Sequence, residues 1–210
     1  MKILALLFMV LLSGCTTTGI SESKTPAPDK GVVFASILFS GSYSQNSIYI
    51  RKVGEADVIR MGLGESMILV PIFPKGDFAD LGYDRMGKKG AVLAEELPPG
   101  DYEIFDWSVR SGYRTISPMK AFSMPFTVVQ GRATYLGSYH FTHRGYMISS
   151  VKVSVENLLE RDGAVFDGKF KEYKAMEKLV HAPAEALFNL GVGSSASTQM
   201  PIPVIVPAPR

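Results

Sequence analysis

The feature that most constrains the fold is a series of short β-type segments between residues 31 and 155, separated by glycine-, proline- and serine-rich turns. Val32–Phe39 is rich in β-branched and aromatic residues, and Ser47–Val53 alternates apolar with polar residues. Further segments of this kind are Ser66–Phe73, Ala91–Leu97, Asp101–Arg110, Ala121–Val129, Arg132–Phe141 and Tyr146–Val155. Seven or eight short strands with regular turn signals predict a mainly β fold, an antiparallel sandwich, over residues 31–185.

Two turns in this series carry recognisable signals. Gln130-Gly131 separates two strand segments and predicts a tight hairpin between them. Leu97-Pro98-Pro99-Gly100 predicts a second hairpin, in which Gly100 has a positive φ or a position crowded by neighbouring backbone. Pro71 interrupts the segment Ser66–Phe73, which favours an edge position or a bend.

The spacing of the apolar residues changes after Val155. They then recur seven, four, three and three positions apart, at Leu159, Phe166, Phe170, Tyr173 and Met176. This spacing predicts one amphipathic helix over Leu158–His181, weakened by Gly163 and Gly168 and ended by Pro183. We expect its aromatic side to pack on the sandwich. A helix that lies on a membrane or a partner is less favoured, because the polar side mixes acids and bases.

The stretch Leu97-Pro98-Pro99-Gly100-Asp101-Tyr102-Glu103-Ile104 resembles the turn and strand of transthyretin-like domains, as in carboxypeptidase regulatory-like modules. Phe126–Gly137, FTVVQGRATYLG, resembles a segment of small bacterial lipoproteins with this fold, and Glu160-Arg161-Asp162 fits their helix start. The resemblance covers about residues 31–180 and implies a transthyretin-like or immunoglobulin-like sandwich with one C-terminal helix. Turn and core signatures specify a fold better than a function, and no catalytic residues come with them.

The N-terminus has the pattern of a bacterial lipoprotein signal peptide over residues 1–14. Lys2 precedes the apolar run Ile3–Leu12, which has the length of a signal-peptide core and is too short to cross a bilayer as a helix. Leu12-Ser13-Gly14-Cys15 resembles the lipobox and predicts cleavage between Gly14 and Cys15, with acylation of the Cys15 thiol. The alternative is an ordinary secretory signal with an incidental cysteine. Cys15 is, however, the chain's single cysteine, and it stands where the lipid machinery requires one.

Two polar segments flank the predicted domain. Residues 15–30 are rich in threonine, serine and proline and predict a flexible tether, and residues 186–210 predict a proline-rich tail. Thr16 follows Cys15 at the position where an aspartate retains lipoproteins in the inner membrane of enteric bacteria. In a Gram-negative host we therefore expect a lipid anchor in the outer membrane, on the periplasmic side.

The charge balance argues against several partners. The formal net charge is +2 and includes Lys2, so the chain after cleavage is close to neutral. It has no basic surplus for nucleic acid and no block of lysines and arginines for acidic lipid. A single cysteine also excludes an intramolecular disulfide.

The chain shows no motif for catalysis. It has no Gly-x-Ser-x-Gly elbow, and no spacing among its serines, acids and three histidines, His140, His143 and His181, selects a triad. His140 and His143 are three apart near a strand end, so their side chains fall on opposite faces, which disfavours a shared metal. Gly62-x-Gly64 lacks the strand, lysine and helix of a phosphate-binding loop. We expect no catalytic residue, no metal and no cofactor.

Calcium is a weaker possibility in the glycine-rich segment Pro74–Gly90. Asp77, Asp80 and Asp84 supply the oxygen ligands that hard cations prefer. Their spacing does not follow an EF-hand, in which ligands alternate at every second residue, and a solvated loop fits at least as well.

One cluster of side chains is a candidate ligand contact: Trp107, Arg110, Tyr113 and Arg114. Aromatic and arginine side chains at a strand end can stack on a sugar or bind a carboxylate. The interpretation that we favour is ordinary core packing of the aromatics with solvated arginines, because one sequence does not separate buried from exposed aromatics.

Together these features predict a membrane-anchored lipoprotein of the cell envelope. We expect a non-enzymatic binding or structural module, whose partner is an envelope protein, peptidoglycan or another glycan. One alternative is an accessory lipoprotein of an envelope secretion or assembly complex, as some transthyretin-like lipoproteins are in type VI secretion. The other is a hydrolase whose active-site motif the sequence does not reveal.

Overall fold

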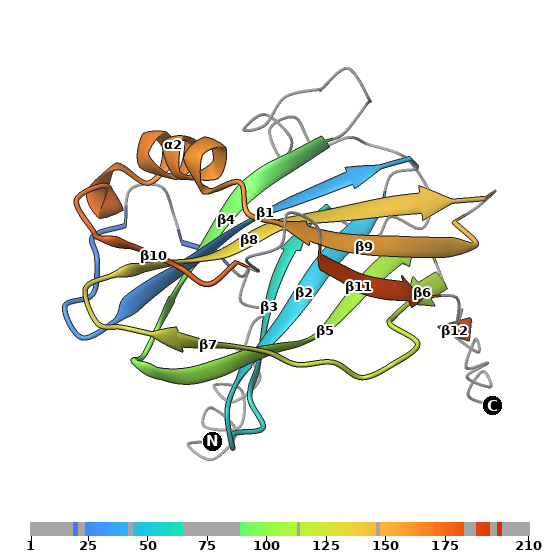
Figure 1. Ribbon diagram of the computed structural model, residues 1–210, viewed down its shortest axis with the longest axis horizontal. Coiled ribbons are helices and arrows are strands. Elements are labelled where there is room, and N and C mark those ends of the chain that lie inside the picture. Colours follow the sequence, from blue (N-terminus) through green and yellow to red (C-terminus); the bar gives the residue numbers. More distant parts are fainter. Residues whose placement is uncertain are drawn as a thin grey trace, which may run out of the picture.

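The structure is a computed structural model that describes residues 19–20, 24–41, 44–64, 89–112, 114–145, 148–182, 188–193 and 197–198. Within these residues twelve strands form two six-stranded sheets, with a helix beside one of them (Figure 1). The fold is mainly β, as the sequence predicts. The expectation of seven or eight strands is too low, because short strands such as β3 (Val58–Leu63) and β6 (Arg114–Ile116) carry little alternating signal.

Sheet A has the strand order β11-β9-β8-β1-β4, and β10 pairs with β8. Its strands are β1 (Gly31–Ser40), β4 (Lys89–Leu97), β8 (Ala133–Arg144), β9 (Ser150–Glu156), β10 (Lys178–Val180) and β11 (Phe188–Gly193). Sheet B has the order β12-β6-β5-β2-β3, and β7 pairs with β5. Its remaining strands are β2 (Gln45–Lys52), β5 (Gly100–Ser111), β7 (Met124–Val128) and β12 (Ser197–Thr198).

Strand β1 is buried on both faces, which explains its nearly continuous apolar sequence. Val33, Ile37 and Phe39 point into the core between the two sheets. Val32 and Phe34 point to the outer face of sheet A, into a second core formed with helix α2 (Leu159–Lys169). Sheet A therefore lies between sheet B and a layer that contains α2, as Figure 1 shows for the helix beside β4, β1 and β8.

Sheet A is mixed, which corrects the expectation of an antiparallel sandwich. Strand β8 runs parallel to β1, in a register that pairs Val32 with Ala133 and Phe39 with Phe141. Strand β8 therefore begins beside the first residues of β1, where the Val32 N–H donates to the Arg132 carbonyl at 2.9 Å. Strand β10 is also parallel to β8.

Both predicted hairpins are wrong, because the two turns carry the chain from one sheet to the other. Leu97 ends β4 in sheet A, and Gly100 begins β5 in sheet B. Gln130-Gly131 likewise joins β7 in sheet B to β8 in sheet A. The positive φ predicted for Gly100 is confirmed at 146°.

Helix α2 is shorter than the predicted Leu158–His181. It ends at Lys169 and is followed by the 3-10 turn η2 (Lys171–Tyr173) and then by β10. Gly168 weakens the last turn, and residues 178–180 gain strand pairing with the start of β8. Phe166, Phe170 and Tyr173 nevertheless all lie in the outer core, as their spacing indicated.

The two flanking segments are more ordered than predicted wherever the structure describes them. Residues 19–20 and 24–30 contact sheet A instead of forming a free tether. Strand β11 pairs with β9, and β12 pairs with β6, both within the residues expected as a tail. Several predictions lie outside the described residues: the signal peptide with Gly14 and Cys15, Thr16, the strand Ser66–Phe73, the three aspartates of the calcium segment, and Tyr113.

Candidate functional site

The candidate site lies where the chain leaves β9 and begins helix α2. The Asn157 side-chain oxygen accepts the Leu159 N–H at 3.3 Å, and the Tyr135 hydroxyl accepts the Leu158 N–H at 3.3 Å. Two of the backbone donors at the helix start are therefore satisfied by side chains. Glu160 and Asp162 add negative charge to the first turn, where the helix dipole favours it.

Asp162 anchors this helix start to sheet A through a fully buried carboxylate. Its Oδ2 accepts hydrogen bonds from the Ser36 and Tyr135 hydroxyls, both at 2.6 Å. Its Oδ1 accepts the Arg161 Nε–H at 2.8 Å. Burial, and then the bond to Asp162, raise the pKa of Tyr135 well above its ordinary value, so this phenol stays a neutral donor.

Arg161 links the buried network to the surface. Its Nη2 donates to the Ser138 hydroxyl at 3.0 Å and lies 2.7 Å from the Asp162 carboxylate. The Ser138 and Ser36 hydroxyls are themselves 2.8 Å apart. The Arg161 side chain is still 41% exposed, so its guanidinium is held on one side by buried acceptors and reaches solvent on the other.

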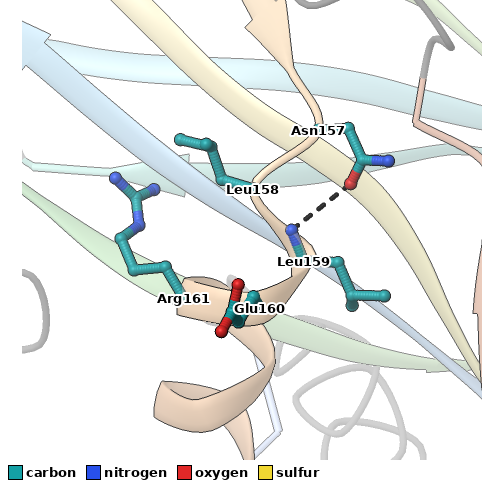
Figure 2. Close-up of a pocket in the computed structure, with 5 residues that line it drawn as sticks. All are labelled: Asn157, Leu158, Leu159, Glu160 and Arg161. Atoms are coloured by element: carbon teal, nitrogen blue, oxygen red, sulfur yellow. Dashed lines mark hydrogen bonds between the residues drawn. The ribbon is translucent and has the colours of Figure 1, made fainter.

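A pocket of about 510 Å³ opens at this helix start. It is lined by Asn157–Arg161, and Figure 2 shows the side chains of Leu158 and Arg161 on one side of the backbone and those of Asn157 and Leu159 on the other, with Glu160 between them. Pockets that bind small molecules typically span about 300–1,000 Å³ and combine apolar walls with a few polar groups. Two leucines with an amide, a carboxylate and a guanidinium fit that description.

The structure does not bring together the predicted ligand-contact residues. Trp107 is completely buried between the sheets, where its ring lies edge-on to Phe141 with centroids 6.1 Å apart. Arg110 is exposed on the outer face of sheet B, because three positions along a strand reverse the side. Arg114 lies on β6 and donates to the Ile148 carbonyl at 3.5 Å. The buried Trp107 and the exposed Arg110 agree with the favoured interpretation, whereas Arg114 is half-buried and hydrogen-bonded, and Tyr113 lies outside the described residues.

The histidines take structural positions. His140 contacts the Ser40 hydroxyl at 3.3 Å on one face of β8, and His143 contacts the Asn46 amide oxygen at 3.0 Å on the other. The ring of His181 lies edge-on to Phe126. Over the described ranges, no three His, Cys, Asp or Glu side chains gather as ligands for a metal ion.

In the sequence, Arg161 and Asp162 stand out only as part of a helix start and Tyr135 only within the segment Phe126–Gly137, and nothing there predicts the hydrogen bonds that join them. Ser36 interrupts the apolar run of β1, and such a polar residue in a doubly buried strand signals a hydrogen-bonded partner. Its partner Asp162 is 126 residues further on, so the sequence alone does not identify the pair.

Fold and site together define a β-sandwich with a helix fixed to one outer face by a buried polar network. No family model matches the chain, and no curated protein matches it. A solved leucine-rich repeat protein from Bacteroides thetaiotaomicron aligns with 54% of this chain and 14% of its own length, at 14% sequence identity and a TM-score of 0.26. A TM-score that low carries no argument about fold or function. No helix in the described part of the chain is long and apolar enough to span a membrane.

Proposed function

We propose that the chain is a lipid-anchored lipoprotein of the cell envelope whose sandwich domain binds a ligand without catalysing a reaction. The anchor is supported by the lipobox-like Leu12-Ser13-Gly14-Cys15 and by the single cysteine at its end. Thr16 supports delivery to the outer membrane, on the periplasmic side, in a Gram-negative host. Separation of the membranes by density tests this location, and recovery with inner-membrane markers would contradict it.

The observation that carries the binding function is the pocket at the start of α2, with Arg161 held in place by the buried Asp162. A fixed guanidinium loses little conformational freedom when it binds a ligand, and it can donate to hydroxyl, carbonyl or carboxylate oxygens. Asn157 and Glu160 add a neutral amide and an acceptor. The mixture suits a polar ligand with both donors and acceptors, such as the sugar units of peptidoglycan, better than a flat protein surface.

We also propose that the sandwich is of the transthyretin-like type. Support comes from the Leu97–Ile104 stretch, in which Tyr102 stands two residues after Gly100. The Tyr102 ring is buried, stacked on Phe126, and its hydroxyl donates to the Pro98 carbonyl at 2.9 Å. The aromatic residue of this motif therefore fixes the turn that precedes it.

Sedimentation with purified peptidoglycan sacculi tests the binding proposal on residues 15–210, produced without the signal peptide and carrying Cys15→Ala so that no lipid is attached. We expect Glu160→Gln and Arg161→Lys to weaken binding several-fold, because both keep the size of the side chain and change its hydrogen bonding. Arg132→Lys is the matched control, since Arg132 pairs with Glu177 on the surface outside the pocket. Thermal melts establish that each variant is folded.

Two results would contradict the peptidoglycan proposal. One is the absence of binding by the unchanged domain. The other is that Glu160→Gln and Arg161→Lys bind sacculi as well as the control Arg132→Lys does. Cross-linking in cells that yields one discrete multi-protein complex would instead favour an accessory role in an envelope assembly.

A further inference from the structure

The residues that follow the proposed lipid site are docked on the domain. We define the N-terminal strap as residues 19–20 and 24–30. The Ile20 N–H donates to the Ala94 carbonyl of β4 at 2.9 Å, and the Ile20 side chain is buried in the outer core with Phe34 and Phe166. Strand β4 is the last strand of sheet A, so the strap covers part of an edge that would otherwise present free backbone groups.

Glu96 holds the middle of the strap. Its carboxylate accepts the Ala27 N–H at 2.8 Å and the Tyr173 hydroxyl at 2.9 Å, and it pairs with the Lys24 ammonium at 2.5 Å. The Glu96 side chain is only 3% exposed. One buried acid thus joins the strap to both β4 and η2.

The end of the strap is fixed as well. Gln130 donates from its side chain to the Pro28 carbonyl at 2.7 Å, and the Gly131 N–H donates to the Lys30 carbonyl at 2.9 Å. The strap is therefore bound at its beginning and its middle by residues of β4, and at its end by the turn between β7 and β8.

The docking sets a short limit on the distance between lipid and domain. An extended chain covers at most about 3.6 Å per residue, so the five steps from Cys15 to Ile20 reach about 18 Å, whatever path they take. A free tether of sixteen steps, from Cys15 to Gly31, would reach about 58 Å. We propose that the lipid and the docked strap hold the β4–η2 side of the domain against the bilayer, with the outer face of sheet B turned away from it. This inference rests on the proposed acylation of Cys15.

The exposed charges on this side suit phospholipid headgroups. Lys171 and Lys174 are exposed on either side of Tyr173, with Glu172 as the acid among them, and Lys24, although paired with Glu96, is still 47% exposed at its side chain. Lysines near an anionic surface each add a modest attraction, which favours this side over others once the lipid has brought the domain close.

Bilayer proximity of single labels tests the orientation in the full acylated protein. Cys15 is the only cysteine, and its thiol is blocked by acylation, so one introduced cysteine takes a fluorophore alone. Lys174→Cys labels the strap side, and Arg110→Cys labels the exposed outer face of sheet B. Each protein is reconstituted in vesicles of equal parts phosphatidylethanolamine and phosphatidylglycerol that contain nitroxide-labelled lipid.

We expect severalfold stronger quenching at position 174 than at position 110. Glu96→Gln together with Ile20→Ser should release the strap and reduce that difference while the protein still floats with the vesicles. Equal quenching at both positions in a floating protein would overturn the inference and leave the anchor intact. A protein that does not float, or whose Cys15 takes up fluorophore, would contradict the proposed acylation and with it this inference.

Discussion

The Tyr135 hydroxyl donates a 2.6 Å hydrogen bond to the Asp162 carboxylate and so ties the central strand β8 to helix α2. Asp162 has no exposed surface, and a buried carboxylate is costly unless its oxygens are hydrogen-bonded. Ser36 and Arg161 supply the other donors, and both carboxylate oxygens are engaged. The network fixes the first turn of α2 and thereby the residues that line the pocket.

Replacing Asp162 should destabilise the domain strongly. Asp162→Ala leaves two buried hydroxyls and a guanidinium without their acceptor, and we expect a loss of about 3 kcal/mol in the free energy of unfolding. Urea denaturation measures it. Glu172→Gln, at an exposed acid in η2, is the control and should change stability by no more than about 0.5 kcal/mol. Equal effects of the two substitutions would show that the network does not hold the helix.

Two glycines should respond to substitution in opposite directions. Gly100 has a φ of 146°, where a Cβ is strained, so Gly100→Val should cost on the order of 1–3 kcal/mol. Gly168 lies in α2 with nothing within 4 Å of the position that a Cβ would take. Gly168→Ala should therefore raise stability, by about 0.5–1 kcal/mol. Thermal melts compare the two, and an unchanged melt for Gly100→Val would argue against the turn as described.

The fluorescence of Trp107 should respond to the packing of the core and not to ligand binding. As the chain's single tryptophan it should give a blue-shifted emission that resists acrylamide quenching, because its side chain is completely buried. Trp107→Ala should cost about 3–5 kcal/mol. Red-shifted, readily quenched emission from the folded protein would place this ring at the surface instead.

The neighbouring acids Glu95 and Glu96 should give opposite pH effects. Burial tends to raise the pKa of Glu96, but hydrogen bonds from Lys24, Ala27 and Tyr173 outweigh it and bring this pKa below its ordinary value of 4.5. Glu96 therefore binds fewer protons in the folded than in the unfolded state. Its contribution to stability is complete above pH 4.5 and is lost as the pH falls through the lowered pKa. Burial raises the pKa of Glu95, so its ionised form destabilises the fold at neutral pH.

We expect Glu96→Gln to lower the melting temperature at neutral pH, with a deficit that shrinks in acid. Glu95→Gln should raise it at neutral pH, with a gain that also shrinks as the pH falls through the raised pKa of Glu95. Melts of both variants from neutral pH down to about pH 3 provide the comparison. A difference in melting temperature between each variant and the unchanged chain that stays constant over this range would show that the pKa values of Glu95 and Glu96 are not shifted by folding in these directions.

The sequence predicted those strands whose own residues form an apolar run or alternate between apolar and polar. The apolar run of β1, the alternation of β2 and the segments that became β4, β5, β8 and β9 all lie within a few residues of their predicted bounds. Strands β3 and β6 were missed, because Gly62 breaks the first pattern and the second has only three residues. Period-two signals need several residues to stand out.

The partners of these elements could not be predicted in the same way. A turn at Gly131 has the same local chemistry whether the next strand pairs with the previous one or crosses to another sheet, and here it crosses. Residues 15–30 were predicted to be a tether because most of them are polar. Ile20 is an apolar exception, and its side chain packs in the outer core. Ser36 and Asp162 each stand out only after the fold has brought them together.

Metabolic labelling with an alkyne analogue of palmitate in the native host is the most direct test of the proposed acylation of Cys15. We compare the unchanged chain with Cys15→Ala, both recovered by immunoprecipitation and normalised to protein. We expect label on the unchanged chain and none on the variant, which should accumulate as an unprocessed precursor or be cut elsewhere. Equal labelling of the two proteins, or an unchanged chain that carries no label, would contradict the proposed lipid anchor.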